Sequence, residues 1–214
     1  MTEENSAGSA LPILFLVVMI DMIGFGIVIP FLTYFIEDLA TVQGITEFGM
    51  WVGLMMVSYS AAQFLFSPLW GSLSDRLGRK PIILVGLVGN TLFFGLFGIS
   101  TSLLMALFAR FCAGAFNANI AVAKAYIGDV SDHTNLAKRM GLIGASFGLG
   151  FTIGPFLGGE FSDPALRWEL FQNTIFETHS YLLPCVIGSL LSTISFVIIS
   201  TGVPSPSLTI QNLS

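Results

Sequence analysis

The sequence predicts an all-α integral membrane protein with six transmembrane helices. Apolar residues make up 54% of the chain and charged residues only 10%, whereas a soluble domain is about 25% charged. The mean hydropathy is +0.83. The apolar residues gather in runs that are each close to the roughly 20 residues a helix needs to cross a bilayer. These runs are residues 11–36, 49–70, 81–99, 103–127, 140–161 and 180–202.

Two other interpretations of the runs fail. Membrane β-strands are about half as long and alternate in polarity, and these runs do neither. A cleaved signal peptide needs a basic flank before a shorter apolar core, but the first run follows Glu3 and Glu4 and contains Asp21. Helices also satisfy every backbone amide within the segment, as the interior of a bilayer demands.

The basic residues predict the orientation. Arg76, Arg79 and Lys80 lie in the second connection, and Lys138 and Arg139 lie in the fourth. The first and third connections hold no Lys or Arg. By the positive-inside rule the second and fourth loops are cytoplasmic. Both termini are then cytoplasmic too, as an N-terminal tail and a short C-terminal tail, in a plasma or inner membrane. The two tails are residues 1–10 and 203–214.

Charge and cysteine usage exclude several classes of function. A net charge of −5 leaves no broad basic face for nucleic acid. Cys112 and Cys185 both lie within apolar runs without metal-ligand spacing, which favours buried free thiols. The sequence contains no nucleotide-binding loop, catalytic triad or metal motif, so we expect neither an enzyme nor a bound cofactor.

The second connection, "GSLSDRLGRK" over residues 71–80, combines glycines, an acid and a basic pair. It resembles the loop between helices two and three of the major facilitator superfamily. The resemblance implies a cytoplasmic gate in which Asp75 and Arg79 join a charge network that holds one of the alternating states. The residues of this motif are Gly71, Asp75, Arg76, Gly78, Arg79 and Lys80.

Further segments carry the same resemblance in the expected order. "RFCAG", with Arg110 and Gly114, resembles the helix-four motif of the superfamily. "IDMIGFGIVIPFL" and "AYIGDVSD" resemble helix one and the end of helix four in tetracycline-efflux-like drug:proton antiporters. "GFTIGPFLGG" resembles the helix-five motif of antiporters, carried here by Gly150, Gly154, Pro155, Gly158 and Gly159. The resemblance covers nearly all of residues 11–162 and implies the N-terminal half, or N-domain, of a major facilitator fold.

Two ionisable residues lie deep within the predicted spans, namely Asp21 and Arg110. Such residues are costly in a membrane and mark function by default. Burial disfavours the charged form of a carboxylate, so Asp21 is predicted to be a proton or cation coupling site. Arg110 keeps its charge and needs an acceptor, which makes it the predicted partner of Asp21. A pair that only pins two helices together is the alternative.

The fourth run has a polar stripe. Arg110, Asn117 and Lys124 are spaced seven residues apart, so they share one helical face. A polar face on a membrane helix indicates the lining of a water-filled cavity. We expect Asn117, rather than Asn119, to face that cavity. Lys124 lies near the cytoplasmic end and is expected to extend toward the membrane surface.

Gln63 and Asn90 are weaker candidates for the cavity lining on the second and third runs. Each amide could equally bond a neighbouring helix. Asp129, which ends the fourth run, is expected to contact Arg79 as a latch between the two cytoplasmic loops.

The fifth run is rich in glycines on two faces. Gly144 and Gly148 form one face, and Gly150, Gly154 and Gly158 form another. Glycines so placed let two helices approach closely. Close packing alone explains this pattern, whereas the resemblance implies a bent helix, kinked by its Pro, that seals and slides against the second half of a transporter.

Together these features predict a secondary transporter that couples the proton gradient to efflux of a small organic molecule or drug, represented by its N-terminal half. Its expected partners are the lipid bilayer, the substrate, and either a C-terminal six-helix half or a second copy of the chain. A metabolite uniporter or symporter of the same superfamily is one alternative. A truncated fragment or an assembly partner that transports nothing is the other.

Overall fold

The computed structural model describes residues 3–129, 131 and 133–202, and the regular secondary structure of this part of the chain is all helical, without a β-strand. Side chains are described from residue 12 onward, except that of His133. The elements are α1 (Glu3–Val42), α2 (Phe48–Leu77), α3 (Arg79–Gly98), α4 (Leu103–Phe116), α5 (Asn119–Asp129), α6 (His133–Glu160), α7 (Pro164–Arg167), η1 (Glu169–Phe171), α8 (Ile175–Thr178) and α9 (Leu182–Gly202).

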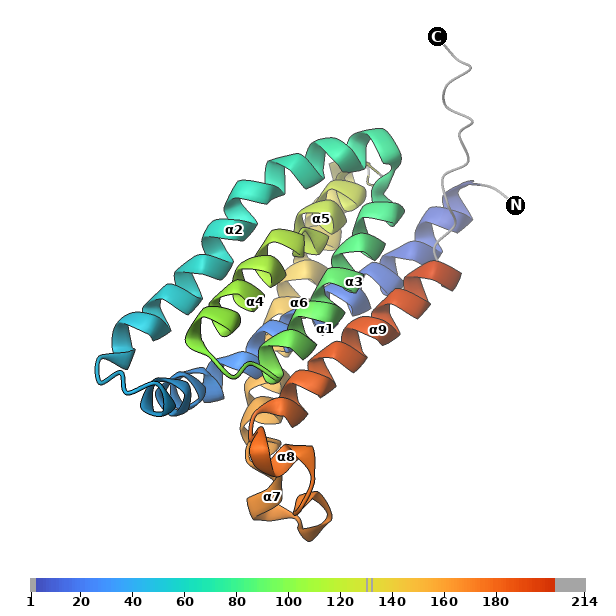
Figure 1. Ribbon diagram of the computed structural model, residues 1–214. Helices are drawn as coiled ribbons and strands as arrows, with labels where there is room; N and C mark the ends of the chain where they lie inside the picture. The colour runs from blue at the N-terminus through green and yellow to red at the C-terminus, as the bar shows by residue number, and fades with distance from the viewer. Residues whose placement is uncertain (1–2, 130, 132, 203–214) are drawn as a thin grey trace.

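The predicted fold class is confirmed. Within the described residues six segments are long and apolar enough to cross a membrane, and they form a single bundle (Figure 1). These segments are Pro12–Val42, Phe48–Leu77, Arg79–Gly98, Leu103–Asp129, Thr134–Glu160 and Leu182–Gly202.

The first helix is longer at both ends than its apolar run. α1 begins at Glu3, within the expected N-terminal tail of residues 1–10, and it continues past residue 36 to Val42. Hydrophobicity cannot mark these ends, because a helix continues into polar sequence until a residue breaks it. Gly44 supplies that break with a φ of 70°, a conformation that suits a residue without a Cβ. The expected C-terminal tail, 203–214, lies outside the described residues.

The fourth span is not one continuous helix. The run 103–127 was expected to form a single helix, but α4 ends at Phe116 and α5 begins at Asn119. The backbone N–H of Asn117 donates to Gly114 O at 3.2 Å instead of continuing the helix. The break lies inside the membrane-spanning segment, where freed backbone groups need other partners.

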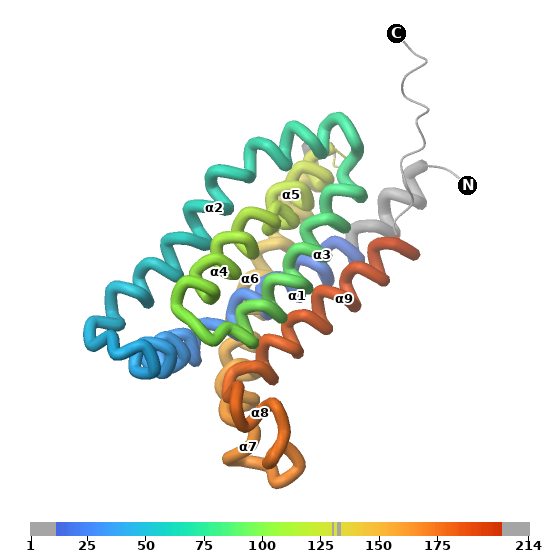
Figure 2. Tube along the Cα trace, viewed as in Figure 1, coloured from blue at the N-terminus to red at the C-terminus, as the bar shows by residue number. Residues whose placement is uncertain are grey.

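Each helix has a defined place in the bundle. α1 lies against both α6 and α9, and α3 lies between α4 and α9 (Figure 2). α2 packs mainly on α4 and forms one outer side. Of the apolar stretch in the first span 61% is buried, compared with 17% in the second. α1 is therefore the core helix of this bundle, and α2 is its most exposed span.

The apolar core consists of two clusters. One gathers around Phe31, Met55 and Phe97, and the other around Leu87 and Val122. On α1, α3 and the α4–α5 segment buried polar residues lie at or near the boundary between the clusters. They are Asp21, Asn90, Asn117 and Asn119. A buried polar layer thus divides the core at a similar level on three helices.

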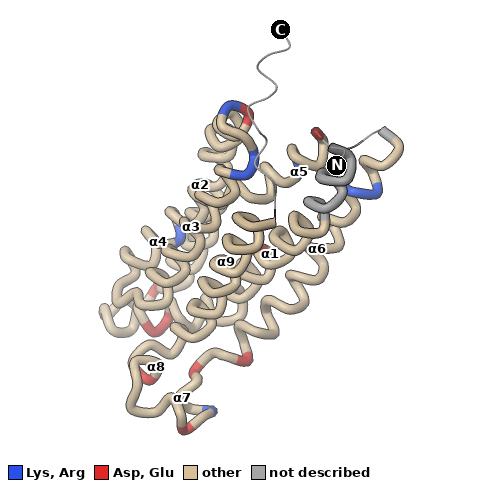
Figure 3. Tube along the Cα trace, turned by 90° about the vertical axis from the view of Figure 1, so that its right-hand side faces the viewer, with Lys and Arg blue, Asp and Glu red and all other residues tan. Residues whose placement is uncertain are grey.

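Most of the basic residues gather at one end of the bundle, where α2 turns into α3 and α5 is followed by α6 (Figure 3). Arg110 within α4 and Arg167 in α7 are the exceptions among the described residues. α1 begins and α9 ends at that same end (Figure 1). The short elements α7, η1 and α8 lie at the other end. There the hydroxyl of Tyr181 donates to Asp38 Oδ2 at 3.2 Å, and the Tyr181 ring stacks on Phe31 with centroids 5.3 Å apart. These contacts attach the connection before α9 to α1.

Candidate functional site

Asp21 is the acidic side chain of the buried polar layer. It lies on α1 with 5% of its surface exposed, and its neighbour on α3, Asn90, is 3% exposed. Asn90 Nδ2 lies 3.5 Å from Asp21 Oδ1, at the limit of a hydrogen bond. Asp21 Oδ2 has no partner within the described residues. The carboxyl group is therefore held by a neutral amide, with one oxygen left available.

Asn119 faces Asp21 from a third helix. It is the first residue of α5, and it is 1% exposed. Its side chain lies over Gly86 of α3, where even a Cβ would collide with Asn119 Oδ1. The amide is close enough to influence the Asp21 carboxyl group, yet neither of its polar atoms makes a formed hydrogen bond in the described part of the chain. Asp21 Oδ2 and both polar atoms of Asn119 are thus unsatisfied within the same buried layer of the described structure, and such groups suit an exchangeable proton or a water molecule.

Arg110 does not pair with Asp21 in this conformation, contrary to the expected partnership. Among the described residues no ion pair involves either of them. Arg110 instead lies over two aromatic rings, with its Cζ 4.6 Å from the centroid of Tyr59 and 5.7 Å from that of Phe97. The face of an aromatic ring attracts a cation, so the rings replace the expected carboxylate.

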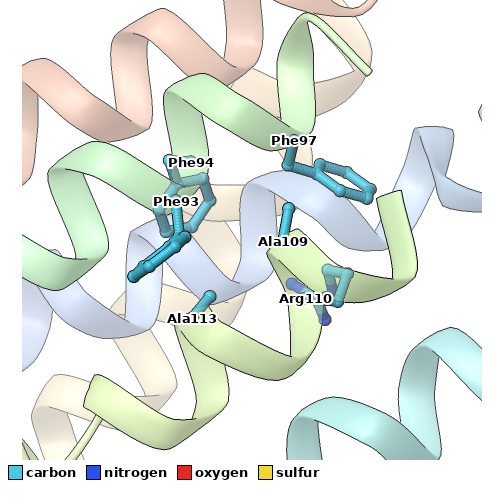
Figure 4. A pocket seen from close by; sticks show the side chains of 6 residues that line it. All are labelled: Phe93, Phe94, Phe97, Ala109, Arg110 and Ala113. Atoms are coloured by element: carbon cyan, nitrogen blue, oxygen red, sulfur yellow. The ribbon is translucent and has the colours of Figure 1, made fainter. Parts of the chain in front are cut away.

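The buried guanidinium group of Arg110 is not fully hydrogen-bonded. Its side chain is 4% exposed, and its Nε has no hydrogen-bond partner within the described residues. Figure 4 shows Arg110 on α4 with Phe97 close by on α3, around a cavity of about 10 Å³. Because this is about the smallest space that holds a water molecule, the guanidinium group has room for one small partner.

Tyr59 is a central residue that the sequence reasoning missed. It lies on α2, 7% exposed, and its hydroxyl oxygen accepts a hydrogen bond from Asn117 Nδ2. α4 can approach it closely because a Cβ at Gly114 would collide with the Tyr59 backbone. One signal was present in the sequence, since Tyr59 lies one helical turn before Gln63 and so shares its face.

The break between α4 and α5 is held by two side chains of α2. Trp70 Nε1 donates to Ala115 O at 2.5 Å, and Gln63 Nε2 donates to Asn117 O at 3.1 Å. A side-chain donor thus meets each of two carbonyls beside the break. Trp70 was not predicted, because nothing in its surroundings distinguishes it from a packing residue.

A groove of about 370 Å³ runs beside this break, between α2 and α5. Asn117 and Gln63 line it, in the positions expected for cavity residues, whereas Asn90 does not and instead faces Asp21. Lys124 also lines the groove, and its Nζ lies 5.9 Å from the centroid of the Phe147 ring. The full lining is Ser60, Gln63, Phe64, Ser67, Asn117, Ile120, Ala121 and Lys124.

The charged loop forms the expected contact between Arg79 and Asp129. Arg79 Nη2 and Nε lie 3.0 and 3.1 Å from Asp129 Oδ2. Arg79 Nη1 lies 2.6 Å from both Asp75 Oδ1 and Ser74 Oγ. One guanidinium group therefore bridges two carboxylates and a hydroxyl, and so joins α2, α3 and α5.

The remaining residues of this loop have plainer roles. Gly78 joins α2 to α3 with a φ of 92°, which L side chains rarely adopt. Lys80 Nζ donates to Ser200 O at 2.9 Å and so ties α3 to the end of α9. Arg76 is exposed, and no neighbouring atom would touch a Cβ at Gly71.

The helix-five glycines pack within this bundle, which favours the close-packing interpretation of this face. A Cβ at Gly150, Gly154 or Gly158 would collide with the α1 backbone near Met22, Ile23 or Ile27. Pro155 joins this contact, because its Cδ lies 3.0 Å from the position of a Cβ at Gly26. In contrast, the sites of Gly144, Gly148 and Gly159 meet no atom within 4 Å. The second glycine face is therefore open within the described structure.

Comparisons with known proteins agree with this architecture. The family model described as Major Facilitator Superfamily matches residues 14–208. Protein ZINC INDUCED FACILITATOR 1 of Arabidopsis thaliana is 36% identical over 158 residues, which are 73% of this chain and 32% of that protein. Tetracycline resistance protein, class C, of Escherichia coli is 32% identical over 181 residues, which are 85% of this chain and 45% of that protein.

A solved structure has the same fold. The human organic anion transporter MFSD10 (TETRAN) superposes with a TM-score of 0.73 at 23% sequence identity, over 95% of this chain and 48% of that one. The chain thus spans between about a third and a half of the length of these relatives.

Proposed function

Because this chain belongs to the Major Facilitator Superfamily, a family of membrane transporters, we propose that it forms the N-terminal half of a proton-coupled exporter of a small organic molecule. Transporters of this kind hold substrate and coupling ions between two halves near the bilayer midplane. A C-terminal six-helix half, or a second copy of the chain, completes the transporter. The bundle end where α2 meets α3 and α6 begins faces the cytoplasm, as the basic residues of these helix ends indicate.

The observation that carries the proposal is the state of Asp21. It is the acid of a buried polar layer, its contacts are amides rather than cations, and its Oδ2 is unsatisfied in the described structure. A carboxyl group without a neighbouring cation gains most from taking up a proton when it is buried. Asp21 therefore serves as the proton site, and uptake or loss of its proton changes which partner it prefers.

Arg110 acts in the same cycle as the fixed positive charge. It remains over the Tyr59 ring while Asp21 is neutral. When Asp21 ionises, the attraction between the two charges in a low-dielectric interior favours their approach. Arg110 is thus a partner of Asp21 in a second state rather than in this one.

The Arg79 bridge serves as the cytoplasmic latch in this proposal. Its two carboxylates, Asp75 and Asp129, are 64% and 57% exposed, so each ion pair adds little stability by itself. A weak contact that links three helices suits a gate, because it can be broken and formed again in each cycle.

The name of one relative, the tetracycline resistance protein of Escherichia coli, supports a drug-like organic molecule as the substrate. A metabolite uniporter or symporter of the same superfamily is the second candidate. Counterflow against a panel of sugars, organic acids and drugs separates the two, because a uniporter exchanges its substrate without moving protons.

Proton movement in proteoliposomes tests the proposal. The chain is reconstituted with a trapped pH-sensitive dye, and tetracycline and the panel compounds are added one at a time. We expect at least one compound to drive proton movement, Asp21→Asn to abolish it and Asp21→Glu to restore part of it. Glu37→Gln is the matched control, since Glu37 is an exposed acid on the same helix. Unchanged proton movement in Asp21→Asn contradicts the proposal.

A further inference from the structure

The groove between α2 and α5 carries one charge and no counter-charge. Among the described residues that line it, Lys124 alone is charged, and the others are polar or apolar. Lys124 forms no ion pair in the described structure, and its recorded neighbour is the Phe147 ring at 5.9 Å. Lys124 is exposed on the bundle surface within the apolar span Leu103–Asp129. An amine there, without an acidic partner, favours an anion that comes from outside the chain.

The floor of the groove is also suited to an anion. α5 begins at Asn119 beside the groove, and Ile120 and Ala121 of its first turn line it. The first N–H groups of a helix have no acceptor within the helix and carry the positive end of its dipole. Asn117 also lines the groove, but its Nδ2 already donates to the Tyr59 hydroxyl oxygen. The free N–H groups of the first turn of α5 are therefore the donors offered here.

The remaining wall is a mixture of hydroxyl groups and apolar surface. Ser60 and Ser67 lie on α2, each about one helical turn from Phe64, whose ring is 80% exposed. The volume of 370 Å³ falls in the range of about 300–1,000 Å³ that small-molecule sites occupy. The site thus offers a cation at one place and an aromatic ring at another.

We propose that this groove binds the substrate as an amphiphilic organic anion, with its acidic group at Lys124 and the start of α5 and its apolar body against Phe64 and Ile120. This inference rests on the proposed transport function and adds a substrate class to it. It also assigns to Lys124 a binding role in place of the extension toward the membrane surface expected from the sequence.

Equilibrium binding tests the assignment without any need for transport. The chain is placed in nanodiscs of zwitterionic lipid, and calorimetry compares 1-naphthoate with the neutral 1-naphthamide and the cationic 1-naphthylmethylammonium. We expect the acid to bind about tenfold more tightly than the amide, since the charge pair forms in a weakly screened site. Equal binding of the three compounds, or no binding of the acid, overturns the inference.

Two pairs of variants locate the site. Lys124→Gln is expected to remove the preference for the acid, whereas Lys138→Gln, at an exposed lysine on α6, leaves it intact. Phe64→Ala weakens binding of acid and amide by the same factor, and Phe156→Ala, at a 67% exposed ring outside the lining, does not. A preference that survives Lys124→Gln overturns the assignment.

Two further arms separate related explanations. If phosphatidylglycerol in the nanodisc displaces 1-naphthoate from the unchanged chain, the anion is a lipid headgroup and the substrate assignment fails. If acid binding persists while Asp21→Asn leaves proton movement unchanged, the proton-coupling proposal fails and the groove assignment stands. If proton movement depends on Asp21 but the acid does not bind, only the groove assignment fails.

Discussion

Two helix contacts in this bundle are built in different ways. One joins α1 to α6, and the other joins α2 to the α4–α5 segment. In the first, Gly150, Gly154 and Gly158 bring one helix backbone onto another without a side chain between them. In the second, Trp70 and Gln63 reach across to carbonyls beside a break. The first contact depends on shape and the second on directed hydrogen bonds.

This difference separates a scaffold from a region that can change. Backbone-on-backbone packing fixes one distance, because any shift either opens a void or creates a collision. A side chain that bonds a free carbonyl can exchange that partner for water or for a ligand at little net free energy. The groove and the buried polar layer both adjoin the second contact, which places the chemistry beside the adaptable side of the bundle.

The largest expected effect comes from filling the scaffold contact. Gly158→Leu forces a side chain into the Ile27 backbone, and overpacking of this kind destabilises by about 3 kcal/mol. Thermal unfolding of the purified chain in detergent measures the loss. Gly144→Leu is the matched control, because its site on the same helix meets no neighbouring atom. Equal losses in the two variants would show that the α1–α6 contact is not as tight as described.

A smaller effect is expected from the adaptable contact. Trp70→Phe keeps an aromatic ring but removes the donor to Ala115 O, so a carbonyl within the membrane loses its partner, at about 1 kcal/mol. Faster amide hydrogen exchange over residues 115–122 reports the change directly.

Trp51→Phe is the control for this variant, since Trp51 lies on the same helix as part of the apolar packing. We expect it to leave exchange at the break unaltered. Comparable acceleration in both variants would mean that ring packing, rather than the hydrogen bond, holds the break.

The smallest effect on stability is expected at the latch. Arg79→Gln removes both ion pairs, but their carboxylates are largely exposed, so unfolding shifts by less than about 1 kcal/mol. The rate at which a thiol reagent labels a cysteine introduced at the α2–α3 turn should nevertheless increase, because the link to α5 is gone. A large loss of stability would instead make Arg79 a structural residue.

The fold could be predicted from the sequence because a bilayer imposes long apolar helices, and the six runs match the six spans. The Arg79–Asp129 contact could also be predicted, since the charges of two short loops meet at one end of the bundle. Gln63 and Asn117 lie in a groove as expected. Each of these predictions depends on a pattern that repeats along a helix or on the identity of a loop.

Other features depend on three-dimensional contacts that no pattern records. No Pro lies inside the run, and Gly114, three residues before Asn117, packs against the Tyr59 backbone. The break at Asn117 depends instead on donors from Gln63 and Trp70 on another helix. The Arg110 guanidinium group lies over the rings of Tyr59 and Phe97 rather than beside a carboxylate. Likewise, periodicity showed two glycine faces on α6 but could not tell which one meets α1.

Infrared difference spectroscopy of the reconstituted chain tests most directly whether Asp21 is the group that takes up a proton. Spectra are recorded as the pH is stepped, in unchanged chain and in Asp21→Asn. The account predicts a carboxylic acid band that varies with pH and is missing from the variant. A titrating band that persists unchanged in Asp21→Asn, or the absence of such a band from the unchanged chain, would contradict it.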